Sequence, residues 1–275
     1  MKFGLVLPNF RSPANTPAGI VAAATAGEIA GFDSVWVSDH ILVPKEHTPY
    51  GNVTEALITL AFLAGITSRV KLGTSVLVLP MRNPIITAKQ FASLDSLAGG
   101  RTIAGVGVGW CEGEYEFLNA DFKHRGKLMD EFVAILRELW TAENPQHSGT
   151  YTFSEAVFTP KPTHMPPVWI GGESNAAVKR AAAMGDGWQP NDRGLEEFAA
   201  KVADLRRYSS GRAVTASIRM RINMQDGVQA NVDRLKSYQD AGLEYPVISF
   251  PHETLDELTA QIDAFGRDII PTLRT

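Results

Sequence analysis

Cysteine, surplus basic charge and long apolar runs are all scarce in this chain of 275 residues. Its single cysteine, Cys111, excludes an intramolecular disulfide and most cysteine-based metal sites. No uncharged apolar stretch approaches the roughly 18 residues of a membrane-spanning helix, and the first apolar run, cut by Pro8, is too short for a signal peptide. Acidic residues (30) outnumber Lys and Arg (26), which argues against nucleic acid. We therefore expect a soluble, cytoplasmic protein whose partners are neither membranes nor nucleic acids.

Short apolar, β-like runs alternate with helix-like segments along the chain. The expected strands are 3–7, 34–37, 70–79, 101–106, 168–170, 187–189, 216–224 and 247–250, and the expected helices are 16–31, 54–67, 84–97, 127–139, 175–184, 195–208, 228–241 and 255–265. Eight strands, each followed by a helix, predict an α/β fold of the (β/α)8, or TIM-barrel, class. A doubly wound sheet is the less favoured alternative, because no GxGxxG follows the first strand.

The fourth and fifth expected strands lie about 60 residues apart, twice the usual length of one βα unit. We interpret about 108–166 as an insertion that contains one helix and, at 149–160, two short runs that predict a hairpin. Long insertions in barrels usually decorate the active face. No linker, charge block or internal repeat divides the chain, so residues 1–275 are expected to form one domain.

In a barrel of this kind, the active site lies at the C-terminal ends of the strands. The residues at those ends are Asn9, Asp39, His40, 75–80, Gly107, Gly109, Trp110, Cys111, Glu112, 171–175 and 189–192. His40 is the most chemical of them, because a histidine can hold a proton near neutral pH. The alternative is a loop histidine that only bonds the backbone. The other histidines form neither HxH nor HExxH spacing, so no metal site is expected.

Two glycine-rich segments can approach a ligand closely. Residues 171–175 precede an Ala-rich helix whose free N–H groups favour a phosphate, although Ser174 could be only the helix N-cap. Gly105 and Gly107 give a flat ligand room against the backbone, or else serve barrel packing. Trp110 is a candidate to stack on a substrate, whereas Cys111 is interpreted as a semi-buried thiol.

Several segments, in this order and spacing, carry a family resemblance over nearly the whole chain. They are FDSVWVSDH (32–40), LGTSV (72–76), LPMRNP (79–84), GGR (99–101), GVGVGW (105–110), PVWIGG (167–172) and GDGW (185–188). With them the chain resembles the bacterial-luciferase-like superfamily of flavin and deazaflavin barrels. The Ser-Asp-His segment is similar to the branch that uses the deazaflavin coenzyme F420, and FMN is the alternative cofactor.

The resemblance implies a ring bound in the barrel mouth. His40 would orient it or act as acid and base toward the substrate, and the Ser75–Val76 peptide would be cis and back the ring. The cofactor-binding residues implied are Asp39, Thr74, Ser75, Val76, Gly105, Gly107, Gly171, Gly172, Glu173 and Ser174. Asn9, Trp110 and Glu112 are the substrate candidates, and Arg82, Lys179 and Arg180 are candidates for the carboxylates of an F420 tail. A homo-oligomer is also expected.

One departure limits the substrate. The sugar-phosphate dehydrogenases of this branch carry a catalytic glutamate soon after the fourth-strand glycines. Trp110 and Cys111 occupy that place here, with Glu112 displaced, so sugar-phosphate oxidation is not supported. The expected function is F420-dependent hydride transfer to or from a small organic substrate. A reduced-FMN monooxygenase and a non-catalytic flavin-binding barrel are the alternatives.

Overall fold

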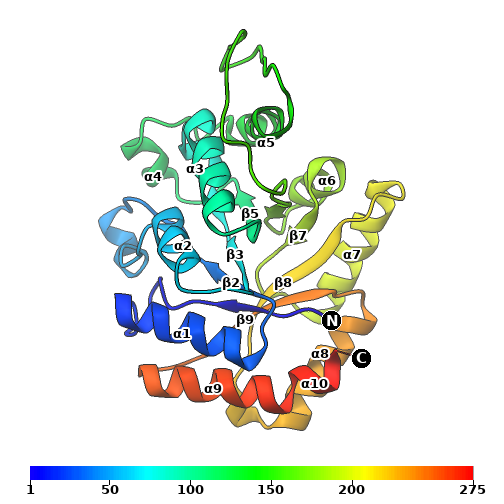
Figure 1. The fold of residues 1–275 in the computed structure, drawn as a ribbon. Coiled ribbons are helices and arrows are strands. Elements are labelled where there is room, and N and C mark those ends of the chain that lie inside the picture. The colour runs from blue at the N-terminus through cyan, green and yellow to red at the C-terminus, as the bar shows by residue number, and fades with distance from the viewer. Residues whose placement is uncertain (275) are drawn as a thin grey trace.

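A closed parallel barrel forms the centre of the molecule (Figure 1). The structure, a computed structural model, describes residues 1–274. The strands follow the order β3-β2-β1-β9-β8-β7-β6-β5-β4, and β3 also pairs with β5, which closes the ring. Their bounds are β1 Gly4–Val6, β2 Ser34–Val37, β3 Lys71–Thr74, β4 Leu77–Val78, β5 Thr102–Gly107, β6 Val168–Gly171, β7 Gly187–Gln189, β8 Thr215–Arg221 and β9 Tyr245–Ser249. Because β3 and β4 are two parts of one barrel strand, the predicted (β/α)8 fold is confirmed.

Helices surround the barrel on its outer side (Figure 1). The α-helices are α1 Pro17–Ala30, α2 Ala56–Ala64, α3 Pro84–Leu97, α4 Glu112–Phe117, α5 Arg125–Thr141, α6 Asn175–Met184, α7 Leu195–Ser209, α8 Val228–Asp240, α9 Leu255–Asp268 and α10 Ile270–Leu273, and the short 3-10 helices are η1 Lys45–Tyr50, η2 Leu79–Met81 and η3 Met224–Asp226. The ends of α1 follow the sequence signals. The Thr16 hydroxyl accepts from the Gly19 N–H, and Gly31 ends the helix at φ 90°. No helix in the described part is long and apolar enough to cross a membrane.

Large aromatic side chains fill the half of the barrel interior that lies at the strand N-termini. The Trp36 and Trp169 rings lie 5.0 Å apart, centroid to centroid, and Tyr245 packs against both. The Trp36 indole needs glycine beside it, because a Cβ at Gly4 or Gly73 would lie 2.4 Å from its atoms. These side chains close the floor of the cavity that opens at the C-terminal ends of the strands.

The third barrel strand differs from its prediction as one run over 70–79. It is interrupted at Ser75 and Val76, and the peptide bond between these two residues is cis, as the resemblance implied. Before the break, β3 pairs with β2. After it, β4 pairs with β5. The interruption therefore turns Ser75 and Val76 out of the ladder at the height where the cavity opens.

The segment between β5 and β6 contains one helix that was predicted and one that was not. The helix expected over 127–139 is α5, whereas α4 has no counterpart in the sequence reading. The hairpin prediction for 149–160 is wrong, since a single antiparallel bridge joins His147 and Phe153. Five prolines fall between 145 and 167, and a proline has no N–H for a strand ladder. Much of this stretch projects beyond the barrel as the long loop at the top of Figure 1.

Candidate active site at the barrel mouth

A cavity of about 380 Å³ opens at the C-terminal ends of the strands. Its size falls within the roughly 300–1,000 Å³ of small-molecule sites. The predicted strand-end residues at its wall are Asp39, His40, Ser75, Val76, Val78, Gly109, Trp110, Cys111, Gly171, Gly172, Gln189, Pro190 and Asn191. The wall also includes residues outside the predicted strand ends, namely Phe10, Arg11, Ser38, Tyr50, Met81, Glu114, Tyr115 and Arg219. Most of the sequence candidates thus meet in one place.

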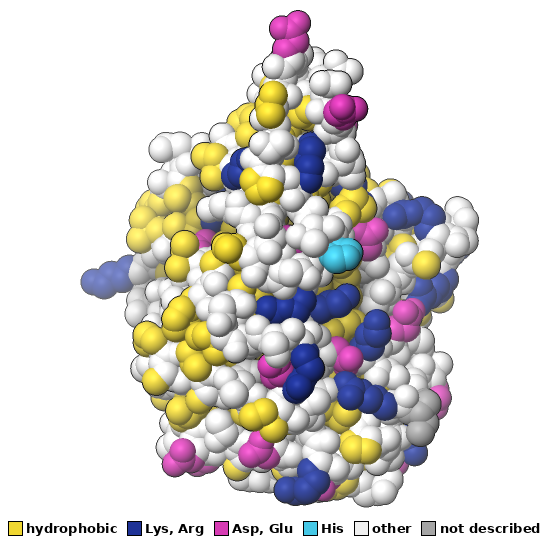
Figure 2. Space-filling model, in the orientation of Figure 1, with side chains coloured by type: hydrophobic (Ala, Val, Ile, Leu, Met, Phe, Trp, Pro, Cys, Tyr) yellow, Lys and Arg dark blue, Asp and Glu magenta, His cyan; other side chains and the backbone are white. Residues whose placement is uncertain are grey.

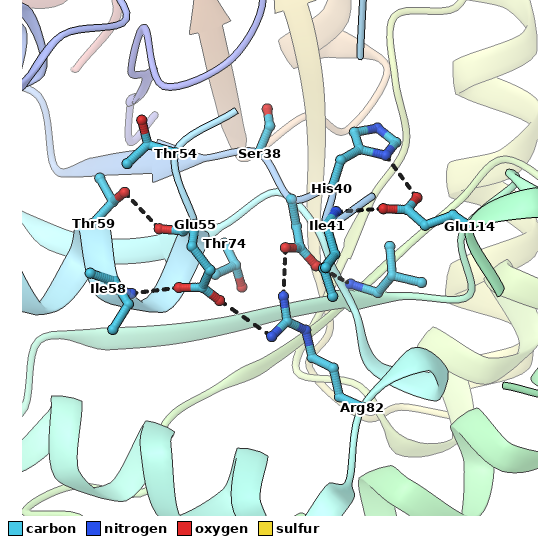
Figure 3. A network of polar contacts seen from close by, with 12 residues as sticks. Ser38, His40, Ile41, Thr54, Glu55, Ile58, Thr59, Thr74, Arg82 and Glu114 are labelled. Carbon is cyan, nitrogen blue, oxygen red and sulfur yellow. Dashed lines mark hydrogen bonds and ion pairs between the residues drawn. The ribbon is translucent and has the colours of Figure 1, made fainter. Parts of the chain in front are cut away.

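His40 is held by a glutamate. Its Nδ1 lies 2.9 Å from Glu114 Oε2, and the Ile41 N–H donates to the other carboxylate oxygen of Glu114 (Figure 3). The side chains of His40 and Glu114 are 11% and 2% exposed. Glu114 lies on α4, whereas the predicted Glu112 is exposed to solvent and lies outside the cavity wall. The sequence analysis did not single out Glu114. Its only signal was its place two residues after the candidate Glu112, on the short helix α4, which was not predicted.

The carboxylate of Glu114 is an acceptor, so Nδ1 of His40 is the donor in this contact. When Nδ1 carries the proton and donates it to Glu114, Nε2 of the neutral ring is left free to accept one. The acceptor beside Nδ1, the carboxylate of Glu114, places a proton on that nitrogen. The ring therefore offers the cavity a nitrogen that can take up and return a proton.

Aromatic side chains enclose His40. The ring centroids of Phe10, Tyr50 and Trp110 lie 5.6, 5.4 and 6.0 Å from that of the imidazole. Trp110 is half exposed and also packs on Tyr50, at 5.1 Å. These faces suit a flat ligand, so the prediction that Trp110 stacks on a substrate is compatible with its position.

The carboxylate of Asp39 is bonded to protein groups. It accepts from the Val78 N–H at 2.9 Å and from Arg82 Nη2 at 2.7 Å, and Arg82 also pairs with Glu55, which caps α2 (Figure 3). Burial raises the pKa of Asp39, while Arg82 and the Val78 N–H oppose the rise. The side chain thereby ties the end of β2 to β4 and η2, and it is a positioning residue for the neighbouring His40.

Asn9 and Thr74 also serve the backbone, and neither is at the cavity wall. The Asn9 amide accepts from the Ser38 N–H and donates to the carbonyls of Ser38 and Thr54. Thr74 Oγ1 donates to the carbonyl of Gly105 at 2.6 Å. Both side chains are buried, and their polar atoms hold the ends of the strands in register.

The glycines of β5 and β6 make room for a side chain of the protein. A Cβ at Gly107 or Gly171 would lie 2.5 Å from a methyl group of Val76. At Gly105 it would lie 1.8 Å from the carbonyl oxygen of Thr74. Gly105 and Gly107 therefore serve barrel packing, and the surface offered to a ligand begins at Val76, which fills the space that they leave.

The start of α6 has the predicted form. Ser174 is its N-cap and accepts from the Ala177 N–H at 3.1 Å, so its hydroxyl is engaged. The Glu173 carboxylate accepts from the backbone and side-chain N–H groups of Asn191. Neither side chain is at the cavity wall, but Gly172, just before them, is. The first backbone N–H groups of the helix remain available to an anion.

Two of the three basic residues expected to face a charged tail are engaged elsewhere. Arg82 pairs with Asp39 and Glu55, and Arg180 pairs with Asp130 and the Gly126 carbonyl. Lys179 lies over the Tyr208 ring, outside the cavity wall. Arg11 is instead the exposed cation at the wall, with its guanidinium 4.8 Å from the centroid of Tyr50.

Gln189 and Arg219 occupy inward positions of β7 and β8 at the cavity wall. Arg219 Nη1 donates to Ser38 Oγ and to the Ser75 carbonyl, each at 3.0 Å. Burial lowers the pKa of Arg219 to about 10, so the guanidinium stays charged at neutral pH. Gln189 is 3% exposed, and within residues 1–274 its amide oxygen and nitrogen have no hydrogen-bond partner.

The Asp39 contacts predict a large loss of stability when the carboxylate is removed. Asp39→Ala leaves Arg82 and the Val78 N–H buried without their nearest acceptor, so we expect the free energy of unfolding to fall by about 3–5 kcal/mol. Urea unfolding followed by tryptophan fluorescence measures it. The matched control is Asp121→Ala, which removes the exposed pair with His124 and should leave the midpoint unchanged. Equal midpoints for the two variants would contradict the assignment.

Comparison with known proteins identifies the family. The family model for luciferase-like monooxygenases matches residues 1–266 of this chain. An F420-dependent glucose-6-phosphate dehydrogenase of Amycolatopsis mediterranei is 35% identical over 192 residues, 68% of this chain and 57% of that protein. An F420-dependent secondary alcohol dehydrogenase in complex with an F420-acetone adduct has the same fold, with TM-score 0.83 and 18% identity over 100% of this chain and 99% of that one. An EDTA monooxygenase from Chelativorans also has this fold, with TM-score 0.80 and 14% identity. The match covers 100% of this chain and 93% of that one. The chain belongs to the luciferase-like monooxygenase family.

Proposed function

We propose that this protein is an oxidoreductase that uses coenzyme F420 to move a hydride to or from a small organic substrate. The observation that carries the proposal is the His40–Glu114 pair at the mouth of a luciferase-like barrel. The similarity to an F420-dependent dehydrogenase at 35% identity supports the choice of coenzyme. Sugar phosphates are not proposed as substrates, because Glu112 is turned to solvent and the glutamate that reaches the wall, Glu114, is bonded to His40 and to the Ile41 N–H.

The residues present fit such a coenzyme. Val76, Val78 and the aromatic side chains around His40 offer apolar surface to a flat ring. The N-terminus of α6, next to Gly172, suits the phosphate, and the exposed Arg11 suits the carboxylates of the tail. When bound, the coenzyme supplies a two-electron hydride carrier. Ser75, Val76, Gly171 and Gly172 would contact it. Asp39, Thr74, Gly105 and Gly107 would act by shaping the strand ends.

His40 would handle the proton that accompanies the hydride. In the oxidative direction Nε2 takes the proton from the substrate, and in the reductive direction it returns one. Glu114 holds the imidazole through Nδ1 and stabilises the charged ring that forms. The enclosing aromatic rings limit the access of water to the pair.

His40→Ala should lower turnover by at least about 100-fold, the usual scale for losing a general acid or base. Coenzyme affinity should stay within a few-fold of wild type, since His40 is proposed to act on the proton. Glu114→Gln should give a smaller loss, and the exposed Glu112→Gln is its matched control. Steady-state oxidation or reduction of F420 with a panel of small organic substrates measures turnover. Wild-type turnover by His40→Ala would overturn the role.

The alternatives differ in what they do with the coenzyme. A reduced-FMN monooxygenase would need oxygen, and the shared fold of the EDTA monooxygenase keeps this candidate open. A non-catalytic barrel would bind a ring without turnover. Deazaflavin reacts poorly with oxygen, so a product that depends on oxygen distinguishes the monooxygenase from the F420 enzyme.

We expect the apoprotein to bind F420 at least about tenfold more tightly than FMN, a difference of about 1.4 kcal/mol. Both coenzymes carry a phosphate, but only F420 has tail carboxylates that Arg11 can bind in charge-assisted contacts. Fluorescence titration of the apoprotein with each compound measures the two affinities. Arg11→Ala should reduce the difference in affinity between F420 and FMN. Lys179→Ala is the control, because Lys179 lies outside the cavity wall. Equal or tighter binding of FMN would favour the monooxygenase, and binding of neither would favour the non-catalytic barrel.

We propose that the chain forms homo-oligomers through an apolar surface of α2 and α3. Ile58, Phe62 and Ile86 are 67%, 52% and 59% exposed, and Ile66, just after α2, is 41% exposed. Figure 2 shows hydrophobic side chains gathered on the side of the molecule where α2 lies. Clustered large apolar side chains on a surface are typical of interfaces.

The double variant Ile58→Glu, Phe62→Glu should be monomeric where the wild type is oligomeric, because charged groups cannot be buried unpaired in the interface. Light scattering coupled to size-exclusion chromatography measures the mass. Ile29→Glu, a change of equal chemistry on α1, is the control. A monomeric wild type at micromolar concentration would contradict the proposal.

A further inference from the structure

A buried amide, that of Gln189, and a partly buried guanidinium, that of Arg219, lie at the cavity wall, and the amide lacks the protein partners that buried polar groups normally have. Gln189 faces the barrel interior, because its neighbour Trp188 packs outward on Phe198 with ring centroids 5.9 Å apart. Both polar atoms of its amide are buried without a hydrogen-bond partner in the described chain. On the adjacent strand, Arg219 makes no ion pair with any described carboxylate, although its Nη1 bonds Ser38 and Ser75.

A buried amide without partners costs stability, and such groups in native proteins call for an explanation. The aromatic filling formed by Trp36, Trp169 and Tyr245 occupies the interior on the strand N-terminal side. The partner must therefore come through the cavity that His40 and Trp110 border. It must also bring both a donor and an acceptor, since Gln189 presents one of each.

We propose that Gln189 and Arg219 bind the pyrimidinedione edge of the coenzyme's ring, an inference that rests on the proposed function. A cyclic imide displays a carbonyl beside an N–H, which matches the donor and acceptor of a glutamine amide in a paired contact. The guanidinium of Arg219 suits a neighbouring carbonyl of the same edge. Deazaflavin and flavin rings share this edge, so these two residues recognise the ring itself and not the phosphate or tail.

The positive charge of Arg219 has a second consequence. A cation near the pyrimidinedione edge stabilises the electron-rich reduced ring relative to the oxidised ring. No carboxylate among residues 1–274 lies within ion-pair distance to neutralise this charge, and the nearby Asp39 is bound to Arg82. Arg219 should therefore raise the reduction potential of the bound coenzyme.

The test compares ligands as well as variants. Wild-type apoprotein, Gln189→Leu and Ser217→Ala are titrated with the phosphate-free deazaflavin that carries only the ribityl chain, and with the same compound methylated on the imide nitrogen. Ser217 is the matched control, because it faces inward from β8, is buried with an unpartnered hydroxyl in the described part of the chain, and is not at the cavity wall. The melting temperature of each apoprotein is measured in parallel.

We expect methylation to weaken binding to the wild type and to Ser217→Ala at least about tenfold, because it removes the donor and blocks the pair. In Gln189→Leu the parent ring should bind at least about tenfold more weakly than to wild type, and methylation should then have almost no further effect. The apoprotein of Gln189→Leu should melt no lower than wild type, since the amide makes no protein contact. If Gln189 had a purely structural role, the melting temperature of this variant would fall below that of wild type.

Equal binding of the parent and methylated rings by the wild type would overturn the proposal without any variant. So would a full methylation effect in Gln189→Leu. If wild type binds flavin more tightly than deazaflavin, the F420 assignment fails, and riboflavin with its 3-methyl derivative then decides this inference in the same way. Binding of neither ring system would overturn both.

Arg219 is tested by the potential of the bound ring. Arg219→Met should lower the midpoint potential relative to wild type, whereas Arg219→Lys, which retains a charge, should stay closer to it. Spectroelectrochemical titration of the reconstituted protein measures both. An unchanged potential in Arg219→Met would overturn the proposed charge effect.

Discussion

The buried contact between Asp39 and Arg82 is the interaction on which the geometry of the site depends. The carboxylate of Asp39 also accepts from the Val78 N–H. This one side chain therefore joins the end of β2 to β4, the strand that resumes after the Ser75–Val76 interruption. Arg82 extends the link to Glu55 at the start of α2. Because the group is buried, the pairing must be satisfied for the strand ends to remain in place. His40 is the next residue in the chain, and its Nδ1 contacts Glu114.

The packing of the barrel interior decides where chemistry can take place. Trp36 fills the N-terminal half because glycines at 4 and 73 leave room for its indole. Higher up, Val76 takes the space left by Gly107 and Gly171, and its side chain becomes part of the cavity wall. The cavity is thus apolar near Val76, basic at Arg219 and able to exchange a proton at His40.

The sequence predicted the barrel well because strand and helix periods, proline stops and glycine caps are local properties. The position of His40 at the cavity wall was predicted in the same way, since the end of β2 lies at the C-terminal face of the barrel. Glu114 was missed in favour of Glu112 because both are glutamates on one short helix. Only the direction of that helix decides which of them reaches His40. Asn9 is at a strand end as predicted, but its amide bonds the backbone around Ser38 instead of facing the cavity.

The amino-acid sequence by itself determined the (β/α)8 architecture, the position of the active face, His40 and the family, because each depends on the order and spacing of residues along the chain. The tertiary structure decided which polar groups are already bonded to protein and which are left for a ligand. Asp39 and Thr74 have partners within the fold, whereas the amide of Gln189 has none in the described chain. Hydrogen bonds between residues 30 or more positions apart cannot be read from a local pattern. They depend on the three-dimensional approach of strands and helices, and that approach decides which polar side chains of this site are bonded within the fold.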